Sequence, residues 1–372
     1  MEANGKNDRN LGIDILRALA MFFVICWHLI GQGGVLASAA EGSGKYWMLS
    51  FLQILSCCAV DVYGITTGYL LCEKKFRLAR LTKIWLTTVF WSVAVSCCLF
   101  LLFPETRTVS EMVSMFLPLL RGRYWFFTAY FVVMLISPAL NLVINEFSGR
   151  QFRLLLVALF LIFGVVPVCS LGYDVLRIST GHHFAWMAVL YLIGGCLKKN
   201  DRQGGMKAEK TPARWLAGYF ALAAVHMLYK CLMSFVGLGA WKDLLLTYPS
   251  PLILGEAVCL FLFFKEACSG IGADSMIAKI MKVVSPGVYA VYVIHVHPQV
   301  YWREDIIARF RAWDDWNTGK VCIALFGTAV AVFTACIVLD AVRQWLFRLL
   351  RIDRTADRLS DRIEGYIRAR VK

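Results

Sequence analysis

The sequence predicts an all-helical membrane protein, a polytopic bundle whose chain crosses the bilayer about ten times. Of its 372 residues, 59% are hydrophobic and only 17% are charged, and the mean hydropathy is +0.62. Soluble domains carry about 25% charged residues. The apolar residues also gather in repeated stretches of about 18–25 residues, which is the length that a helix needs to span a bilayer. Because the backbone in hydrocarbon must satisfy its own hydrogen bonds, these stretches are predicted to be helices.

The ten predicted spans follow one another along most of the chain. The first apolar stretch lacks a small-residue cleavage pattern, so we expect a retained helix and not a signal peptide. A further stretch at 112–120 has the composition of a re-entrant or interfacial segment. The predicted spans are 11–30, 46–71, 84–103, 124–145, 154–172, 182–197, 215–237, 244–264, 283–301 and 321–342.

The distribution of basic residues predicts how the chain is oriented. With the N-terminus in the cytoplasm, the segments predicted inside carry nearly three times as many Lys and Arg residues as those predicted outside. Positively charged loops stay cytoplasmic, so both termini are predicted inside. The same bias accounts for the net charge of +14 without nucleic-acid binding. A membrane domain over 1–342 is then followed by a tail, 343–372, predicted to be a basic helix on the anionic inner leaflet.

An arginine and a histidine lie inside the first predicted span. Arg17 and His28 are eleven residues apart, which is about 20° past three full helical turns and about 16 Å along the axis, so both point the same way. Asp14 is spaced to orient the Arg17 guanidinium. Arginine suits phosphate, and histidine is the commonest general base. This pair fits a long substrate with a phosphorylated head and a reactive end, such as an acyl-coenzyme A.

Other polar residues in or beside the spans have competing interpretations. Asp61 and Glu256 are carboxylates inside spans, where a structural partner or a proton relay is expected, and Lys230 is a candidate partner for Glu256. His182 and His183 are expected to anchor a helix end at the interface. The thirteen cysteines form no CxxC pair, so no metal site is predicted.

Five motifs occur in a fixed order and together resemble the acyltransferase-3 family of membrane O-acyltransferases. Two positions depart from the family's second motif, because Gly64 follows Tyr63 where the family has a second aromatic residue, and Thr67 replaces a serine. The motifs are GIDILRALAMFFVICWH (12–28), VDVYGITTGYLL (60–71), KKFRLARLTKIW (74–85), RYWFFTAYFVVMLISPAL (123–140) and VYVIHVHPQV (291–300).

The resemblance implies transfer of an acyl group, usually acetyl, from cytoplasmic acyl-coenzyme A to a hydroxyl. The acceptor would be a glycan or lipid-linked sugar at the envelope, and the location a bacterial cytoplasmic (inner) membrane. By the same resemblance, His28 would be the general base or a transient acyl carrier, and Arg17 would hold the donor. Arg77 and Arg80 would bind the coenzyme phosphates, although the positive-inside bias also explains both arginines.

Three further assignments depend on the resemblance or leave an alternative open. Either His295 or His297 could hold the family's late histidine position, and the sequence YVIH favours His295. Trp125 could stack on a ligand or belong to the aromatic belt. A proton-coupled transporter or flippase is the alternative function, because buried carboxylates and a histidine also suit transport.

Overall fold

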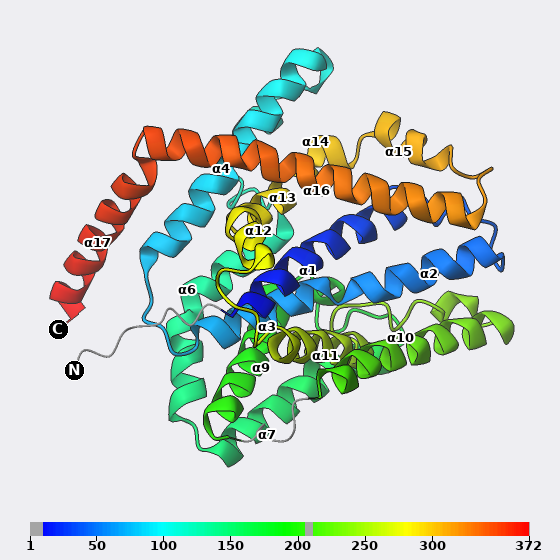
Figure 1. Ribbon diagram of the computed structural model, residues 1–372, viewed down its shortest axis with the longest axis horizontal. Helices are drawn as coiled ribbons and strands as arrows, with labels where there is room; N and C mark the ends of the chain where they lie inside the picture. Colours follow the sequence, from blue (N-terminus) through cyan, green and yellow to red (C-terminus); the bar gives the residue numbers. More distant parts are fainter. Residues whose placement is uncertain (1–9, 205–210, 372) are drawn as a thin grey trace.

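The computed structural model describes residues 10–204 and 211–371, which form a helical bundle without a strand in these ranges (Figure 1). The predicted fold class is therefore confirmed. The α-helices are α1 (Leu11–Ile30), α2 (Gly44–Cys57), α3 (Ala59–Leu71), α4 (Leu78–Leu102), α5 (Val109–Phe116), α6 (Trp125–Glu146), α7 (Gly149–Phe160), α8 (Val166–Cys169), α9 (Phe184–Arg202), α10 (Pro212–Phe235), α11 (Pro251–Ala267), α12 (Met276–Val284), α13 (Val288–His295), α14 (Pro298–Tyr301), α15 (Glu304–Arg311), α16 (Thr318–Leu349) and α17 (Ile352–Val371).

Each of the ten predicted spans falls on a helix or a helical run. Within the described ranges, eight of these are long and apolar enough to cross a membrane. The other two predicted spans are α9, whose last turns are charged, and α11, which has only 17 residues. The predicted span 283–301 is too long, since α13 ends at His295 and Pro298 starts a separate short helix. The span 46–71 is interrupted at Cys58, between α2 and α3.

The bundle has two ends, which we call the inner end, where α1 begins, and the outer end, where α1 ends. At the inner end Asp201 of α9 accepts hydrogen bonds from the Tyr69 hydroxyl at 2.7 Å and from the Lys265 ammonium at 2.6 Å. This one carboxylate therefore joins the inner ends of α3, α9 and α11. The inner end corresponds to the cytoplasmic side predicted from the loop charges.

Helices α3 and α9 pack closely because each has a glycine where the other's backbone passes. A Cβ atom on Gly68 would lie 1.9 Å from the Tyr191 carbonyl oxygen, and one on Gly194 would lie 2.0 Å from the Ile65 carbonyl oxygen. Small residues allow this approach between membrane helices, where packing replaces the hydrophobic effect as the main attraction. The α3–α9 contact holds the interrupted span firmly against the rest of the bundle.

Gly68→Ala is expected to destabilise the protein, because the added methyl group forces α3 and α9 apart. Overpacking of this kind costs roughly 1–3 kcal/mol. Thermal unfolding of the purified protein in detergent would measure the loss. Gly327→Ala in α16 is the matched control, since a Cβ atom there meets nothing within 4 Å. Equal melting temperatures for the two variants would contradict this account of the packing.

The C-terminal tail is helical, as predicted, but it does not begin at residue 343. Helix α16 continues without interruption to Leu349, and α17 follows after Arg351, which has a positive φ of 54°. Figure 1 shows α17 beside α4, and Lys83 of α4 pairs with Asp357 of α17 at 2.9 Å. The predicted boundary at residue 342 therefore lies inside one continuous helix, and the tail is packed against the membrane domain.

Candidate active site

A cavity of about 540 Å³ lies toward the inner end of the bundle, and we call it the inner cavity. Its walls come from α1, α3, α4, α6, α13, α16 and the start of α17. Apart from Asp353, all its charged lining residues are basic. They are Arg17, Arg80, Lys83, Arg343 and Arg348. A pocket with this charge favours an anionic ligand such as phosphate.

Two of these cations already have carboxylate partners. The Arg343 guanidinium donates to both oxygens of Asp340, at 2.6 and 3.0 Å, and Lys83 pairs with Asp357. The Arg80 guanidinium, in contrast, donates to the Lys75 carbonyl oxygen at 3.3 Å and has no carboxylate within 4.0 Å among the described residues. Its positive charge, like that of Arg17, is therefore available to a ligand.

Two residues named from the sequence are placed differently from the expectation. Arg77 does not line the inner cavity, and its exposed guanidinium lies 3.8 Å from Asp361 of α17. The reason is that Arg77 is the N-cap residue before α4, with extended backbone, whereas Arg80 belongs to the first turn of the helix. Asp14 and Arg17, both in the described part of α1, do not form an ion pair, so the predicted orienting contact is absent.

A second cavity, of about 280 Å³, lies toward the outer end, and we call it the outer cavity. His28 lines it, as do Ser56 and Cys57 beside the interruption between α2 and α3. An interrupted helix is tolerated in a membrane where it borders a cavity. The remaining wall is largely aromatic, formed by Trp27, Tyr63, Tyr124, Trp125, Phe126, Tyr248, Tyr292, Tyr301 and Trp302.

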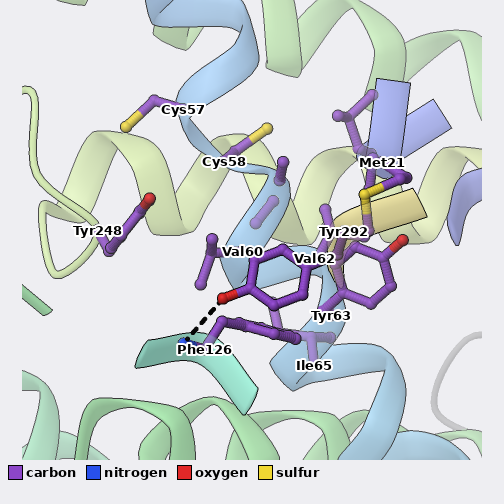
Figure 2. Close-up of a cluster of buried hydrophobic side chains, with 14 of the residues drawn as sticks. Met21, Cys57, Cys58, Val60, Val62, Tyr63, Ile65, Phe126, Tyr248 and Tyr292 are labelled. Carbon is purple, nitrogen blue, oxygen red and sulfur yellow. Dashed lines mark hydrogen bonds between the residues drawn. The ribbon is translucent and has the colours of Figure 1, made fainter. Parts of the chain in front are cut away.

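The two cavities meet at a common wall. Met21, Tyr63 and Phe126 line both of them, and Figure 2 shows these three side chains beside Tyr292. The Tyr63 hydroxyl donates a 2.6 Å hydrogen bond to the carbonyl oxygen of Arg17, which holds α3 against α1 at this point. Arg17 lines the inner cavity and His28 the outer cavity, so the arginine and the histidine lie on opposite sides of a thin partition of side chains.

His28 is paired with His295, the late histidine that the sequence favoured. The Nδ1 atom of His28 lies 3.1 Å from Nε2 of His295, and Nδ1 of His295 lies 2.6 Å from the carbonyl oxygen of Val291. Tyr301 packs edge-on against the His28 ring, with centroids 4.9 Å apart. The imidazole of His28 is therefore fixed in orientation by a hydrogen bond on one side and an aromatic ring on another.

The hydrogen bonds determine which nitrogen of His28 can accept a proton. A carbonyl oxygen can only accept, so Nδ1 of His295 carries the hydrogen and its Nε2 atom is an acceptor. His28 then donates from Nδ1 to that acceptor, which leaves its Nε2 lone pair free. A base oriented in this way by a second residue is the arrangement expected for general-base catalysis.

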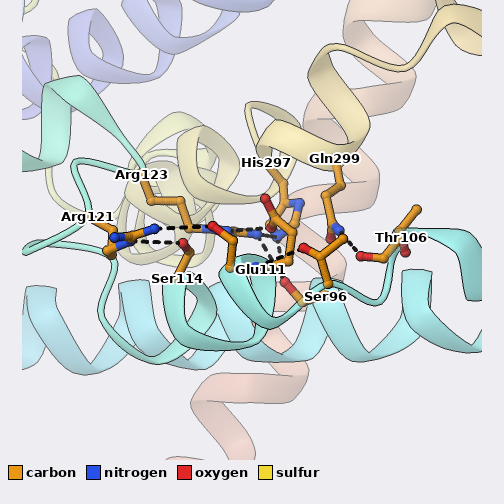
Figure 3. Close-up of polar contacts among 10 residues, drawn as sticks. Ser96, Thr106, Glu111, Ser114, Arg121, Arg123, His297 and Gln299 are labelled. Atoms are coloured by element: carbon orange, nitrogen blue, oxygen red, sulfur yellow. Dashed lines mark hydrogen bonds and ion pairs between the residues drawn. The ribbon is translucent and has the colours of Figure 1, made fainter.

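Arg123 is a buried arginine on the outer cavity, although its place in the sequence, just before a predicted span, indicates an outside loop. The side chain of Arg123 is 2% exposed, and it donates to Glu111 at 2.7 Å and to Ser96 at 3.1 Å (Figure 3). Glu111 belongs to α5, the short helix found where a re-entrant or interfacial segment was expected. Arg123 therefore ties α5 to α4 across the outer end of the bundle. The sequence signal for a role of Arg123 is that it directly precedes the aromatic residues YWFF at the start of a predicted span.

His297 belongs to this network and not to the histidine pair. Arg123 donates to its Nε2 atom at 3.0 Å, in the connection after α13 (Figure 3). Burial lowers the pKa of His297 to about 3, and the charge of Arg123 lowers it in the same direction. The imidazole is therefore neutral at physiological pH, as an acceptor from arginine must be.

Aromatic residues gathered from distant segments form the far wall of the outer cavity. Trp125 stacks on Tyr248, with ring centroids 5.7 Å apart, and its ring lies 4.4 Å from that of His182. His183 caps α9 by accepting from the Ala185 amide at 3.2 Å. Only His183 thus serves a helix end, whereas His182 lines the cavity. Sequence spacing could not reveal that residues 125, 182 and 248 converge.

Asp61 and Glu256, the carboxylates named above as structural or relay candidates, are buried and line neither the inner nor the outer cavity. Asp61 accepts a hydrogen bond from the indole of Trp186 at 3.0 Å, whereas Glu256 has no hydrogen-bond partner among the described residues. The proposed Lys230–Glu256 pair is wrong, because Lys230 pairs with Asp243 at 2.7 Å. Gly255, next to Glu256, packs against Leu222, which is about two helical turns from Lys230 along α10, so the two charged residues lie at different levels of the helix pair.

Comparison with known proteins identifies the family. The acyltransferase-domain model of the acyltransferase-3 family matches residues 10–340. No curated protein and no solved structure matches the chain. The resemblance predicted from the five motifs is thus confirmed over nearly the whole chain. The match gives the family and the long apolar helices place the chain in a membrane. The chain is therefore a multi-pass membrane acyltransferase of the acyltransferase-3 family.

Proposed function

We propose that the protein transfers an acyl group, acetyl in the simplest case, from cytoplasmic acyl-coenzyme A to a hydroxyl of an envelope glycan or lipid-linked sugar. The membrane would be the bacterial cytoplasmic membrane. The observation that carries the proposal is the free Nε2 atom of His28 in an aromatic cavity, next to a basic cavity across the wall of Met21, Tyr63 and Phe126.

Each cavity takes one substrate in this proposal. The phosphates of the coenzyme bind Arg17 and Arg80 in the inner cavity, and its thioester passes the partition to reach His28. The sugar occupies the outer cavity, where Trp125 and Tyr248 offer flat apolar faces and Gln32 offers a polar group. Trp125, Tyr124 and Tyr301 exclude water from the thioester.

The chemical step uses one proton acceptor. The acceptor hydroxyl oxygen attacks the thioester carbonyl carbon, a C–O bond forms and the C–S bond breaks. Nε2 of His28 takes the hydroxyl proton during attack and returns it to the departing thiolate, which leaves as the coenzyme thiol. His295 accepts from Nδ1 of His28 throughout and stabilises the imidazolium. The products are an ester and free coenzyme A, with no net proton released.

The test uses the purified full chain in lipid nanodiscs, radiolabelled acetyl-coenzyme A and an envelope glycan fraction from cells that lack the gene. Label is expected in the glycan fraction, with coenzyme A thiol released in equal amount. Mass spectrometry of surface glycans from cells with and without the gene would identify the acceptor. Movement of a substrate across the membrane without covalent transfer would contradict the proposal and favour a transporter.

Arg80→Gln is expected to raise the KM for acyl-coenzyme A by about tenfold, because one charge-assisted phosphate contact is lost. The value of kcat should change little, since the arginine is far from the thioester. Arg77→Gln is the matched control from the same basic segment, and its KM should remain within about twofold of the wild type. Steady-state kinetics would measure both. Equal effects of the two variants would contradict a specific contact at Arg80.

A further inference from the structure

A third cavity, of about 370 Å³, adjoins the histidine pair from another side, and we call it the side cavity. Its walls come from α1, α13, α15 and α16, with Val95 of α4. None of the described residues that line it is charged. Its lining is aliphatic and aromatic apart from the two histidines, Gln32, Tyr301 and Cys336. A site of this composition binds apolar groups.

The side cavity and the outer cavity share part of their walls. His28, Gln32 and Tyr301 line both, and His295 lines the side cavity alone. One helix, α1, contributes to all three cavities, with Arg17 and Met21 at the inner cavity and His28 at the outer cavity. Ile25 and Leu29, on either side of His28 in the sequence, line the side cavity. A substituent on a carbonyl carbon held at His28 therefore has an apolar space directly beside it.

The side cavity is far larger than an acetyl methyl group requires. A cavity of about 150 Å³ already holds a benzene molecule, and the side cavity has more than twice that volume. A bound aliphatic chain would contact Ile294 and Val332, with Leu339, which is 47% exposed, at the surface of the bundle. Each methylene that moves from water into such surroundings contributes favourable transfer free energy. The cavity should therefore bind a chain of several carbons more tightly than a methyl group.

Charge distinguishes between the possible sources of such a chain. The tail of a lipid-linked sugar is joined to the sugar through phosphate, which would have to sit between the side cavity and the outer cavity. The residues shared there are His28, Gln32 and Tyr301, and none is a Lys or Arg. The two terminal nitrogens of Arg123, across the outer cavity, already donate to protein acceptors. A neutral chain attached directly to the reacting carbonyl requires no such cation.

We propose that the side cavity holds the aliphatic chain of the donor's acyl group, so that the enzyme transfers acyl groups longer than acetyl. This inference rests on the proposed function and names its acyl class. The same bonds form and break as before, with the hydroxyl proton passing through His28 to the thiolate. Only the substituent on the carbonyl differs, and it lies between α1, α13 and α16.

The test compares donors of increasing chain length, namely acetyl-, butyryl-, hexanoyl- and octanoyl-coenzyme A, with the envelope glycan fraction as acceptor. Wild-type kcat/KM is expected to be higher for hexanoyl- or octanoyl-coenzyme A than for the acetyl donor. Val332→Phe and Ala335→Phe reduce the space in the cavity. Both should lower the ratio of octanoyl to acetyl kcat/KM by about tenfold or more. Val338→Phe adds the same bulk to α16, where Val338 is 60% exposed and lines none of the three cavities, and it should leave the ratio unchanged.

The outcomes separate this inference from the proposed function. Transfer from acetyl-coenzyme A with rejection of the longer donors would overturn the inference alone. An unchanged octanoyl to acetyl ratio in both cavity variants would also overturn it, because the acyl chain of the donor would then lie outside the side cavity. Absence of label transfer from every donor, including acetyl, would overturn the proposed function itself.

Discussion

Replacing His28 with alanine is expected to reduce acyl transfer by roughly 10²-fold to 10⁴-fold, which is the usual contribution of a general base. The physical reason is the Nε2 atom of His28, which the hydrogen bond to His295 and the Tyr301 ring hold in a fixed orientation at the outer cavity. His28→Gln should be equally inactive, because an amide keeps the size and polarity of the side chain but cannot take a proton. The measurement is release of coenzyme thiol by purified variants.

A matched control is needed because His28 also packs inside the bundle. His226 in α10 is a buried histidine that lines none of the three cavities described above. His226→Asn should therefore keep wild-type turnover. Protein yield, elution volume on size exclusion and melting temperature should match among all the variants. Wild-type turnover by His28→Ala would remove His28 from the mechanism.

Much of the site followed from local sequence, because a helix fixes the relative directions of its own side chains. Arg17 and His28 were placed on one face by helical phase alone, and the structure puts them at adjoining cavities. The positions of the spans were also predictable from local sequence, because the length of an apolar stretch determines whether it can cross the bilayer. The preference for His295 over His297 rests on a four-residue sequence, YVIH, and the structure places His295, not His297, beside His28.

Contacts between helices were not predictable in the same way. Lys230 and Glu256 have opposite charges on consecutive helices, yet Lys230 meets Asp243 in the following loop. Arg123 reads as an outside loop residue, and only tertiary packing shows that it is buried against Ser96. Arg77 and Arg80 are three residues apart, but α4 begins between them. The Arg80 side chain therefore lines the inner cavity, whereas that of Arg77 points toward Asp361 of α17. The partners of Lys230 and Arg123 lie outside the helices that carry the neighbouring sequence, where helical phase gives no information.

The second large effect is expected at His295, which acts through His28 and is a positioning residue. His295→Leu removes the acceptor for Nδ1 of His28, so the imidazole can adopt the wrong tautomer and the imidazolium loses its partner. Loss of an orienting residue of this kind lowers kcat by about 10²-fold to 10⁴-fold. The KM for acyl-coenzyme A should stay within about twofold, since the inner cavity is untouched.

A merely structural role for His295 would give a different pattern, and the conservative variant separates the two. His295→Gln retains a carbonyl oxygen that can accept from His28, so it should recover part of the lost kcat, whereas His295→Leu should not. His297→Gln tests the other histidine, which contacts Arg123 and not His28. If His297→Gln lost kcat while His295→Leu kept it, the late histidine would be His297, and the orientation of His28 by the hydrogen bonds through His295 to the Val291 carbonyl oxygen would not matter for catalysis. With the expected pattern, the free Nε2 atom of His28 owes its position to a carbonyl oxygen two hydrogen bonds away.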